Sequence, residues 1–185
     1  MDIAKSQNEH FAFFPRCIFA PGSYNAQSRK DLSTVSRFRS SLDTKDLSVT
    51  LLERLENDPL ARHLGVELLE VESGYARARM AVEPYHRNAF GLVHGGAIFG
   101  LADCAFQAAS NSHGVFSVAV QASISYLRAP DGNVLFAEAT EVSRTKRLAY
   151  YSIRITQEGD ALIALFQGFV YRMPDKSPPD AASGA

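Results

Sequence analysis

The sequence predicts an α+β domain in which a curved antiparallel sheet of five to six strands wraps around one long central helix. Residues 97–111 are nearly all small or apolar and are long enough for about four helical turns. Two strand-like runs precede this segment and four follow it. Parallel neighbours would each need a crossover helix, and only one long helix is available, so the strands must pair mainly in antiparallel fashion.

The first part of the chain differs in composition from the rest. Residues 1–46 join a phenylalanine cluster to a Ser, Arg and Lys segment without a sustained period, which predicts a mobile or loosely docked extension. The alternative is a targeting segment, because these residues include few acids and several arginines. The continuous apolar region of a secretory signal is missing, however. The domain is predicted over 47–173, and the Pro, Ser and Ala residues of 174–185 predict a disordered tail.

Within the domain, a short amphipathic helix is predicted first, because leucine and valine recur near helical spacing after Leu47. It should end near residues 57–59 or resume for one turn before Gly65. Runs over 66–71 and 75–82 then form a hairpin, and the second run alternates between a buried and a wet face. The residues predicted on its buried face are Ala76, Ala78, Met80 and Val82.

Four extended runs follow the central helix, over 115–127, 134–142, 149–156 and 161–171. The last run is apolar on both faces, which predicts a strand covered on each side. The first run alternates, so that one face should be apolar and the other polar. Its apolar face is predicted to carry Val118, Val120, Ala122, Ile124 and Tyr126, and its polar face Ser117, Gln121, Ser123 and Ser125.

Composition excludes several function classes. The formal net charge is -1 and no basic stripe interleaves with aromatics, so we expect no nucleic-acid partner. No apolar run approaches the roughly 20 residues that cross a bilayer, so we expect no membrane span. Cys17 and Cys104 are the only cysteines, and neither a disulfide framework nor a metal site is expected from them. Cytoplasmic location fits this cysteine usage.

Asp103 is the one ionisable residue within the apolar helix, and His94-Gly95-Gly96 precedes that helix. A carboxylate in such a segment is either satisfied by specific partners or used in chemistry. The glycines leave backbone N–H groups of the first turn open to a ligand. On these residues alone, Asp103 serves either as an interface hydrogen-bond acceptor or as a catalytic acid or base, and His94 either as a capping residue or as a base.

A stripe of small and polar residues runs along one side of the same helix at steps of three or four. Such a stripe predicts close packing against another polypeptide or a bound group. Its members are Gly96, Gly100, Asp103, Gln107 and Ser110.

The central segment resembles the hotdog-fold acyl-CoA thioesterases, specifically the phenylacetic-acid-degradation (PaaI-like) group. That group has an Asn six positions before a His-Gly-Gly and an Asp nine positions after the His, and Asn88, His94 and Asp103 stand at these spacings. Ala105-Phe106 then matches the D-x-A-F pattern. The resemblance extends more weakly over residues 50–173, including Tyr126-Leu127-Arg128, and leaves both termini uncovered.

The resemblance implies hydrolysis of an aryl- or medium-chain acyl-CoA, with no cofactor beyond the coenzyme A of the substrate. The Gly95 N–H would polarise the thioester carbonyl, Asn88 would orient the water or the carbonyl, and Asp103 would act as general base or as nucleophile. His94 would position the loop. Paired subunits would share each site, which also explains the small-residue stripe, and a homodimer or homotetramer is expected.

Further side chains are candidates for binding the substrate. Gly96 and Gln107 lie on the helical stripe, and Ser123 and Ser125 either line the acyl pocket or face solvent or an interface. Basic residues are candidates for the phosphates of coenzyme A, or are simply solvated turn residues. These basic residues are Arg128, Arg144, Lys146 and Arg147.

Two other functions fit the same fold. A hotdog hydratase normally has its Asp and His five residues apart, and the residue five after Asp103 is Ala108, which argues against it. A non-catalytic acyl-CoA-binding or regulatory module would use the same cleft, and the intact set of Asn88, Gly95 and Asp103 disfavours it.

Overall fold

The computed structural model describes residues 53–179. The predicted N-terminal extension, the start of the predicted amphipathic helix and the end of the predicted tail lie outside these residues. Residues 53–56 are helical, and α3 (Pro59–His63) follows after Asp58, whose carboxylate accepts from the Ala61 N–H at 2.9 Å. The predicted interruption and resumption of this helix before Gly65 are therefore confirmed, and Gly65 takes the positive φ of 63° that favours glycine.

The rest of the described chain contains one six-stranded antiparallel sheet and one long helix, which confirms the predicted fold class. The spatial order β1-β2-β4-β5-β6-β3 makes β1 and β3 its two edges. The strands are β1 (Val66–Glu72), β2 (Tyr75–Ala81), β3 (Ser117–Tyr126), β4 (Val134–Arg144), β5 (Leu148–Gln157) and β6 (Leu162–Arg172).

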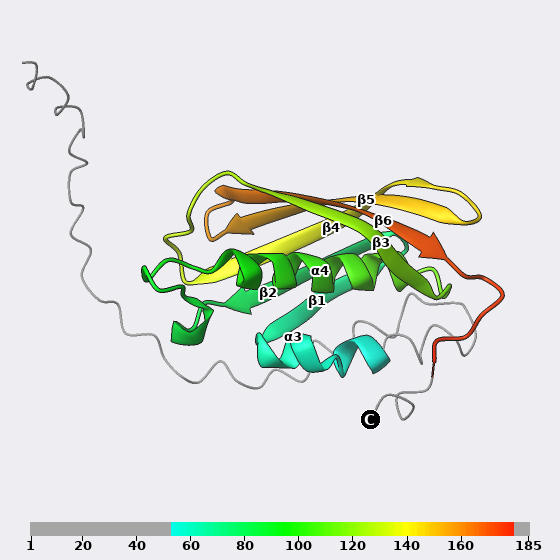
Figure 1. The fold of residues 1–185 in the computed structure, drawn as a ribbon, viewed down its shortest axis with the longest axis horizontal. Coiled ribbons are helices and arrows are strands. Elements are labelled where there is room, and N and C mark those ends of the chain that lie inside the picture. The colour runs from blue at the N-terminus through cyan, green and yellow to red at the C-terminus, as the bar shows by residue number, and fades with distance from the viewer. Residues whose placement is uncertain (1–52, 180–185) are drawn as a thin grey trace, which may run out of the picture. The chain divides into compact units, whose positions relative to one another are not determined.

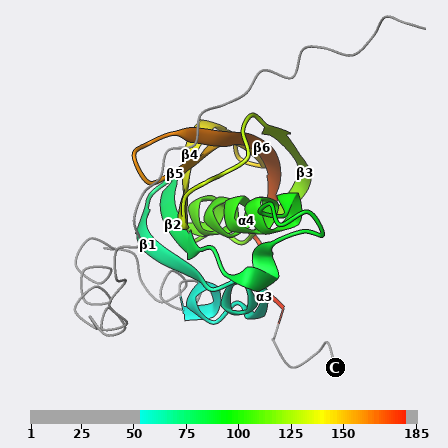
Figure 2. The ribbon, with the colours of Figure 1, turned by 90° about the vertical axis from the view of Figure 1, so that its left-hand side faces the viewer.

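The central helix, α4 (Gly95–Asn111), begins two residues before the predicted start at Ala97, because His94 caps it. The sheet curves around α4, and α3 lies on the open side, as Figure 2 shows. Leu101, Ala102, Ala105 and Phe106 of α4 are fully or almost fully buried, as is the predicted inner face of β2 from Ala76 to Met80. None of the helices within the described residues is long and apolar enough to span a bilayer.

One member of the small-residue stripe of α4 packs against its own chain. Gly100 faces α3 of its own chain: a Cβ added there would lie 2.5 Å from Leu64 Cδ1. Glycine at this position therefore admits an intrachain leucine, and a neighbouring central helix is not needed to explain it. The next stripe residues, Asp103 and Gln107, are half-buried and exposed, respectively.

The predicted apolar face of β3 is wrong in its first half. A bulge interrupts the pairing with β6 between Ala119 and Gln121. A bulge shifts the alternation of side chains, so Val118 shares the outer face with Tyr171 while Ile124 lies opposite the buried Phe166. β3 is an edge strand and is exposed along most of its length, and Val120 at the bulge is 59% exposed.

The prediction that β6 is covered on both sides is also wrong for the single chain. Its inner face, with Phe166 and Val170, is buried against α4 and the core, but Phe169 and Tyr171 on the outer face are exposed. Exposed apolar side chains continue across the neighbouring strand at Leu148. The outer face of the sheet thus carries an apolar area that no described residue covers.

Candidate active site

The start of α4 presents one uncommitted backbone donor. His94 has the extended conformation of a capping residue, and its Nδ1 accepts from the Gly96 N–H at 2.8 Å. The N–H groups of Ala97 and Ile98 donate to the His94 carbonyl. The Gly95 N–H donates to no atom of residues 53–179. It therefore remains available to a ligand at the positive end of a 17-residue helix.

Asn88 builds the turn that leads to this helix. Its Oδ1 accepts from the N–H groups of Phe90 (2.9 Å) and Leu92 (3.2 Å), and its own N–H donates to the Leu92 carbonyl. Gly91 completes the turn with a φ of 77°. Because Oδ1 already accepts two hydrogen bonds, the Nδ2 amide is the part of Asn88 that is free to act on a substrate. That part is a donor, which suits a carbonyl oxygen.

A buried histidine, which the sequence analysis did not identify, holds the base of this loop. His86, in the short helix η2 (Pro84–His86), is 2% exposed, and its Nδ1 accepts from the Glu83 N–H at 3.0 Å. Its carbonyl accepts from the His94 N–H at 2.7 Å. Burial lowers the pKa of His86, so the ring is held in the neutral form that this acceptor role needs. His86 thereby connects the Asn88 turn to the cap of α4.

Tyr126, at the end of β3, also reaches the start of α4. Its hydroxyl donates to the Gly95 carbonyl at 2.9 Å, and its ring lies where it would meet a Cβ added to Gly95. In the sequence, Tyr126 is marked only as part of a motif, because no local pattern reveals a contact across 31 residues.

Asp103 lies two turns further along α4. The carboxylate is half-buried and makes no hydrogen bond or ion pair with another described residue. Burial, and secondly the charge of Asp58, raise its pKa above the ordinary value, which makes it a stronger base than an exposed carboxylate. It lies eight positions after Gly95, or about 12 Å along the helix axis. Reacting groups must come within about 3.5 Å of each other, so this separation is large for two groups of one chain that act on the same carbonyl.

The predicted substrate-binding residues are not all gathered around this helix. The N–H of Gly96 is used by His94, and Gln107 is an exposed residue further along α4. Ser123 and Ser125 pair with Gln167 and Leu165, which places them on the outer face of the sheet, away from α4. Within one chain, the two serines are therefore separated from Gly95 and Asp103.

The basic residues divide into three environments. Arg128 is exposed and lies just after the end of β3, two residues beyond Tyr126. Lys146 and Arg147 lie in the turn between β4 and β5, and Arg147 pairs with Asp175 at 3.1 Å. Figure 1 shows this turn at the end of α4 opposite to Gly95.

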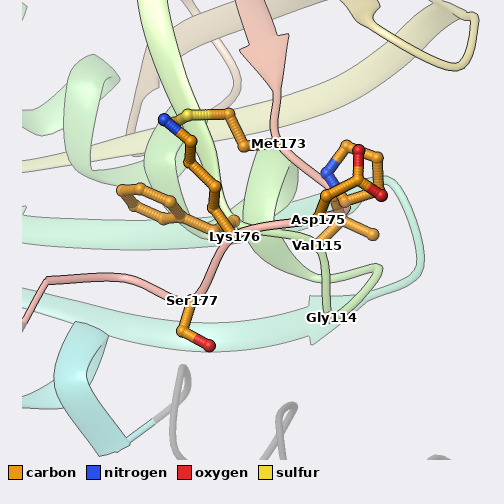
Figure 3. A pocket seen from close by; sticks show the side chains of 8 residues that line it. Gly114, Val115, Met173, Asp175, Lys176 and Ser177 are labelled. Carbon is orange, nitrogen blue, oxygen red and sulfur yellow. The ribbon is translucent and has the colours of Figure 1, made fainter.

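Arg144 is engaged in a polar network beside that turn. Its Nε donates to Glu141, which also accepts from Tyr151 (2.8 Å) and contacts His113 Nε2 (2.7 Å). Burial alone would raise the pKa of Glu141, but these hydrogen bonds bring it below its ordinary value. A cavity of about 240 Å³ lies nearby between residues 114–116 and 173–177 (Figure 3). It is lined by residues far from Gly95 in the fold.

Comparison with known proteins identifies the family. The profile described as "Thioesterase superfamily" matches residues 90–164. A putative esterase of Archaeoglobus fulgidus is 43% identical over 125 residues, covering 67% of this chain and 81% of that protein. The chain belongs to the thioesterase superfamily. The acyl-coenzyme A thioesterase PaaI of Escherichia coli is 35% identical over 119 residues, covering 64% of this chain and 85% of the relative.

Solved structures of this superfamily have the same architecture. The E. coli PaaI protein from the phenylacetic acid degradation operon aligns with a TM-score of 0.62 and 32% identity, over 68% of this chain and 95% of that one. The superfamily match begins at residue 90, two residues after Asn88, and includes His94, Gly95 and Asp103. The residues identified from the sequence thus lie in or beside the segment that defines the family.

Proposed function

We propose that the protein hydrolyses the thioester of an aryl- or medium-chain acyl-CoA to the free acid and coenzyme A, without a cofactor. The observation that carries the proposal is the pairing of a free N–H at the start of α4 with an uncommitted, half-buried carboxylate on the same helix. A thioester needs both: a donor for the oxyanion and a group that activates water. The name of the E. coli relative supports the substrate class.

Each residue has a distinct role in this reaction. The Gly95 N–H binds the carbonyl oxygen, with the Asn88 Nδ2 amide as a second donor, and His94 holds the cap. As general base, Asp103 takes a proton from water while the hydroxide adds to the carbonyl carbon. The C–S bond then breaks and the thiolate leaves. As nucleophile, Asp103 would instead form a mixed anhydride that water hydrolyses.

We further propose that two chains share each site, with Gly95 and Asn88 from one subunit and Asp103 from the other. The 12 Å axial separation supports this, as does the exposed edge of β3, because a free edge of ten residues is a surface for pairing with another strand. A twofold axis would pair β3 with its own copy in antiparallel fashion. Two such dimers would form the tetramer.

The antiparallel arrangement would bring the β4–β5 turn of one subunit toward the Gly95 end of the other. Lys146 and Arg147 there, with Arg128 from the first subunit, are our candidates for the phosphates of coenzyme A. Arg144 is a weaker candidate because Glu141 already accepts from it.

Release of free thiol from a panel of aryl- and medium-chain acyl-CoAs tests the activity, using wild type, Asp103→Ala and Asp103→Asn. We expect turnover by wild type and a loss of about 100-fold or more in both variants. Asp160→Asn is the matched control, because Asp160 is an exposed carboxylate in the β5–β6 turn with a φ of 60° that Asn tolerates. Binding without turnover by wild type would favour the non-catalytic module, and equal rates in Asp103→Ala would refute the role of Asp103.

Single-turnover hydrolysis in ¹⁸O-labelled water separates the two mechanisms. If Asp103 is the nucleophile and water attacks the aspartyl carbon of the mixed anhydride, the label enters the Asp103 carboxylate. A general base leaves the label in the released acid alone, so label in Asp103 identifies the nucleophile.

A further inference from the structure

The peptide group between Gly95 and Gly96 is held at both of its ends. Its carbonyl accepts from the Tyr126 hydroxyl at 2.9 Å, and its N–H donates to His94 Nδ1 at 2.8 Å. The first contact comes from the end of β3 and the second from the residue that precedes α4. Two side chains from different elements therefore fix one peptide plane directly beside the free Gly95 N–H.

This fixation matters because both residues are glycine. Glycine samples more backbone conformations than any other residue, so two consecutive glycines leave the direction of the first N–H poorly defined by the chain itself. The contact with Tyr126 also leaves little room for a side chain at position 95. A Cβ at this position would lie 3.1 Å from both Cζ and Oη of Tyr126, which is closer than such atoms ordinarily approach.

We propose that Tyr126 is a positioning residue for the oxyanion donor: it holds the Gly95–Gly96 peptide so that the Gly95 N–H points at the thioester carbonyl. The inference rests on the proposed function and deepens it. Tyr126 does not touch the reacting atoms through this hydrogen bond; it acts through the peptide that it orients. A preorganised donor stabilises the developing oxyanion without reorganising during the reaction.

The position of Tyr126 separates this role from a role in stability. The side chain is 51% exposed in the single chain and lies outside the hydrophobic core. Removal of its hydroxyl should leave the fold intact. Since β3 is the strand expected to pair between subunits, Tyr126 also connects that edge to the start of α4.

Steady-state kinetics of Tyr126→Phe test the proposal. The variant keeps the ring beside Gly95 and loses the hydrogen bond, so kcat should fall about 10-fold, the equivalent of one neutral hydrogen bond, while KM stays within about twofold. Tyr171→Phe is the matched control, because Tyr171 is an exposed tyrosine on the outer face of the sheet. It should keep wild-type kcat.

The backbone itself supplies a readout that does not depend on turnover. In protein labelled with ¹⁵N-glycine, the Gly96 amide should exchange with solvent at least about 10-fold faster in Tyr126→Phe than in wild type, because one end of the peptide is released. The glycine amides far from α4, such as Gly159 in the β5–β6 turn, should be unaffected.

A double variant tests the steric part of the contact. Gly95→Ala should lower kcat about 100-fold when Tyr126 is present, because the added Cβ displaces the first turn. In a Tyr126→Ala background, where the ring is absent, the same substitution should have an effect of less than about threefold.

The outcomes are separable. Wild-type kcat together with unchanged amide exchange in Tyr126→Phe would overturn the positioning role, as would a rise in KM with unchanged kcat. If wild-type protein hydrolyses none of the acyl-CoAs, the proposed function fails, and the amide exchange still decides whether Tyr126 fixes the peptide.

Discussion

Gly168→Ala should destabilise the protein by a predictable mechanism, the displacement of α4 from the sheet. A Cβ at Gly168 of β6 would lie 2.6 Å from Cζ and 2.7 Å from Cε1 of Phe106 on α4. Carbon atoms in contact prefer about 3.5 Å or more, so the ring would have to move by about 1 Å. It has little freedom to do so, because it is 1% exposed and packs against Tyr151 and Phe166.

Overpacking of this kind lowers the free energy of unfolding by about 2 kcal/mol, and we expect the melting temperature to fall by roughly 5–10 °C. Thermal and urea denaturation measure both. Gly132→Ala is the matched control, since its Cβ would make only ordinary contacts of 3.5 Å with Gln157. Adding Phe106→Leu to Gly168→Ala should recover part of the loss. A Gly168→Ala protein as stable as wild type, or a double variant that is simply the sum of two losses, would refute the packing argument.

Two further predictions concern titratable groups. Glu141→Gln removes the charge that organises the polar network and should lower the free energy of unfolding by about 2 kcal/mol in urea denaturation at neutral pH. Hydrogen bonds bring the pKa of Glu141 below its ordinary 4.5. The stabilisation that ionised Glu141 gives the wild-type protein is therefore present above that pH and is lost as the pH falls through the folded pKa. An unchanged urea midpoint in the variant would contradict this. Asp58→Asn retains the helix cap and removes a negative charge near Asp103, so the pKa of Asp103 should fall and the acid limb of kcat/KM should move to lower pH. A limb that stays in place would show that Asp58 does not influence the base.

The sequence was sufficient for the elements with strong local patterns. The long apolar run over 97–111 and the alternating pattern over 75–82 show directly which residues of each segment are buried. Both elements form in the structure, with small differences at their ends. The spacing of Asn88, His94 and Asp103 likewise indicates the superfamily without any knowledge of the geometry. The roles assigned to these residues remain predictions.

The remaining features depend on contacts between distant segments. The bulge in β3 arises from its pairing with β6, so the regular alternation in its sequence gave no sign of it. Gly100 is small because Leu64 packs against it, and Tyr126 reaches Gly95 across 31 residues. Such contacts are set by the folded arrangement, which periodicity in a single segment does not encode.

The structure also sharpens the role of Asn88. From the sequence, this residue could orient either the attacking water or the carbonyl. Its Oδ1 accepts from two backbone N–H groups of its own turn, so only the Nδ2 amide can face a ligand. A donor in this place favours the carbonyl oxygen, as a second hydrogen bond beside that of Gly95.

Complementation between two inactive variants tests the central claim, a thioester site shared by two chains, most directly. Asp103→Ala lacks the base, and Gly95→Ala has a displaced oxyanion donor; each alone should retain about 1% of wild-type kcat. When the two are co-expressed in equal amounts, random pairing makes about half of all dimers mixed, and each mixed dimer has one site free of both substitutions. The account predicts recovery of about one quarter of the wild-type rate of thiol release from acyl-CoA. A mixture no more active than its parents would place both groups in one chain and contradict the shared site.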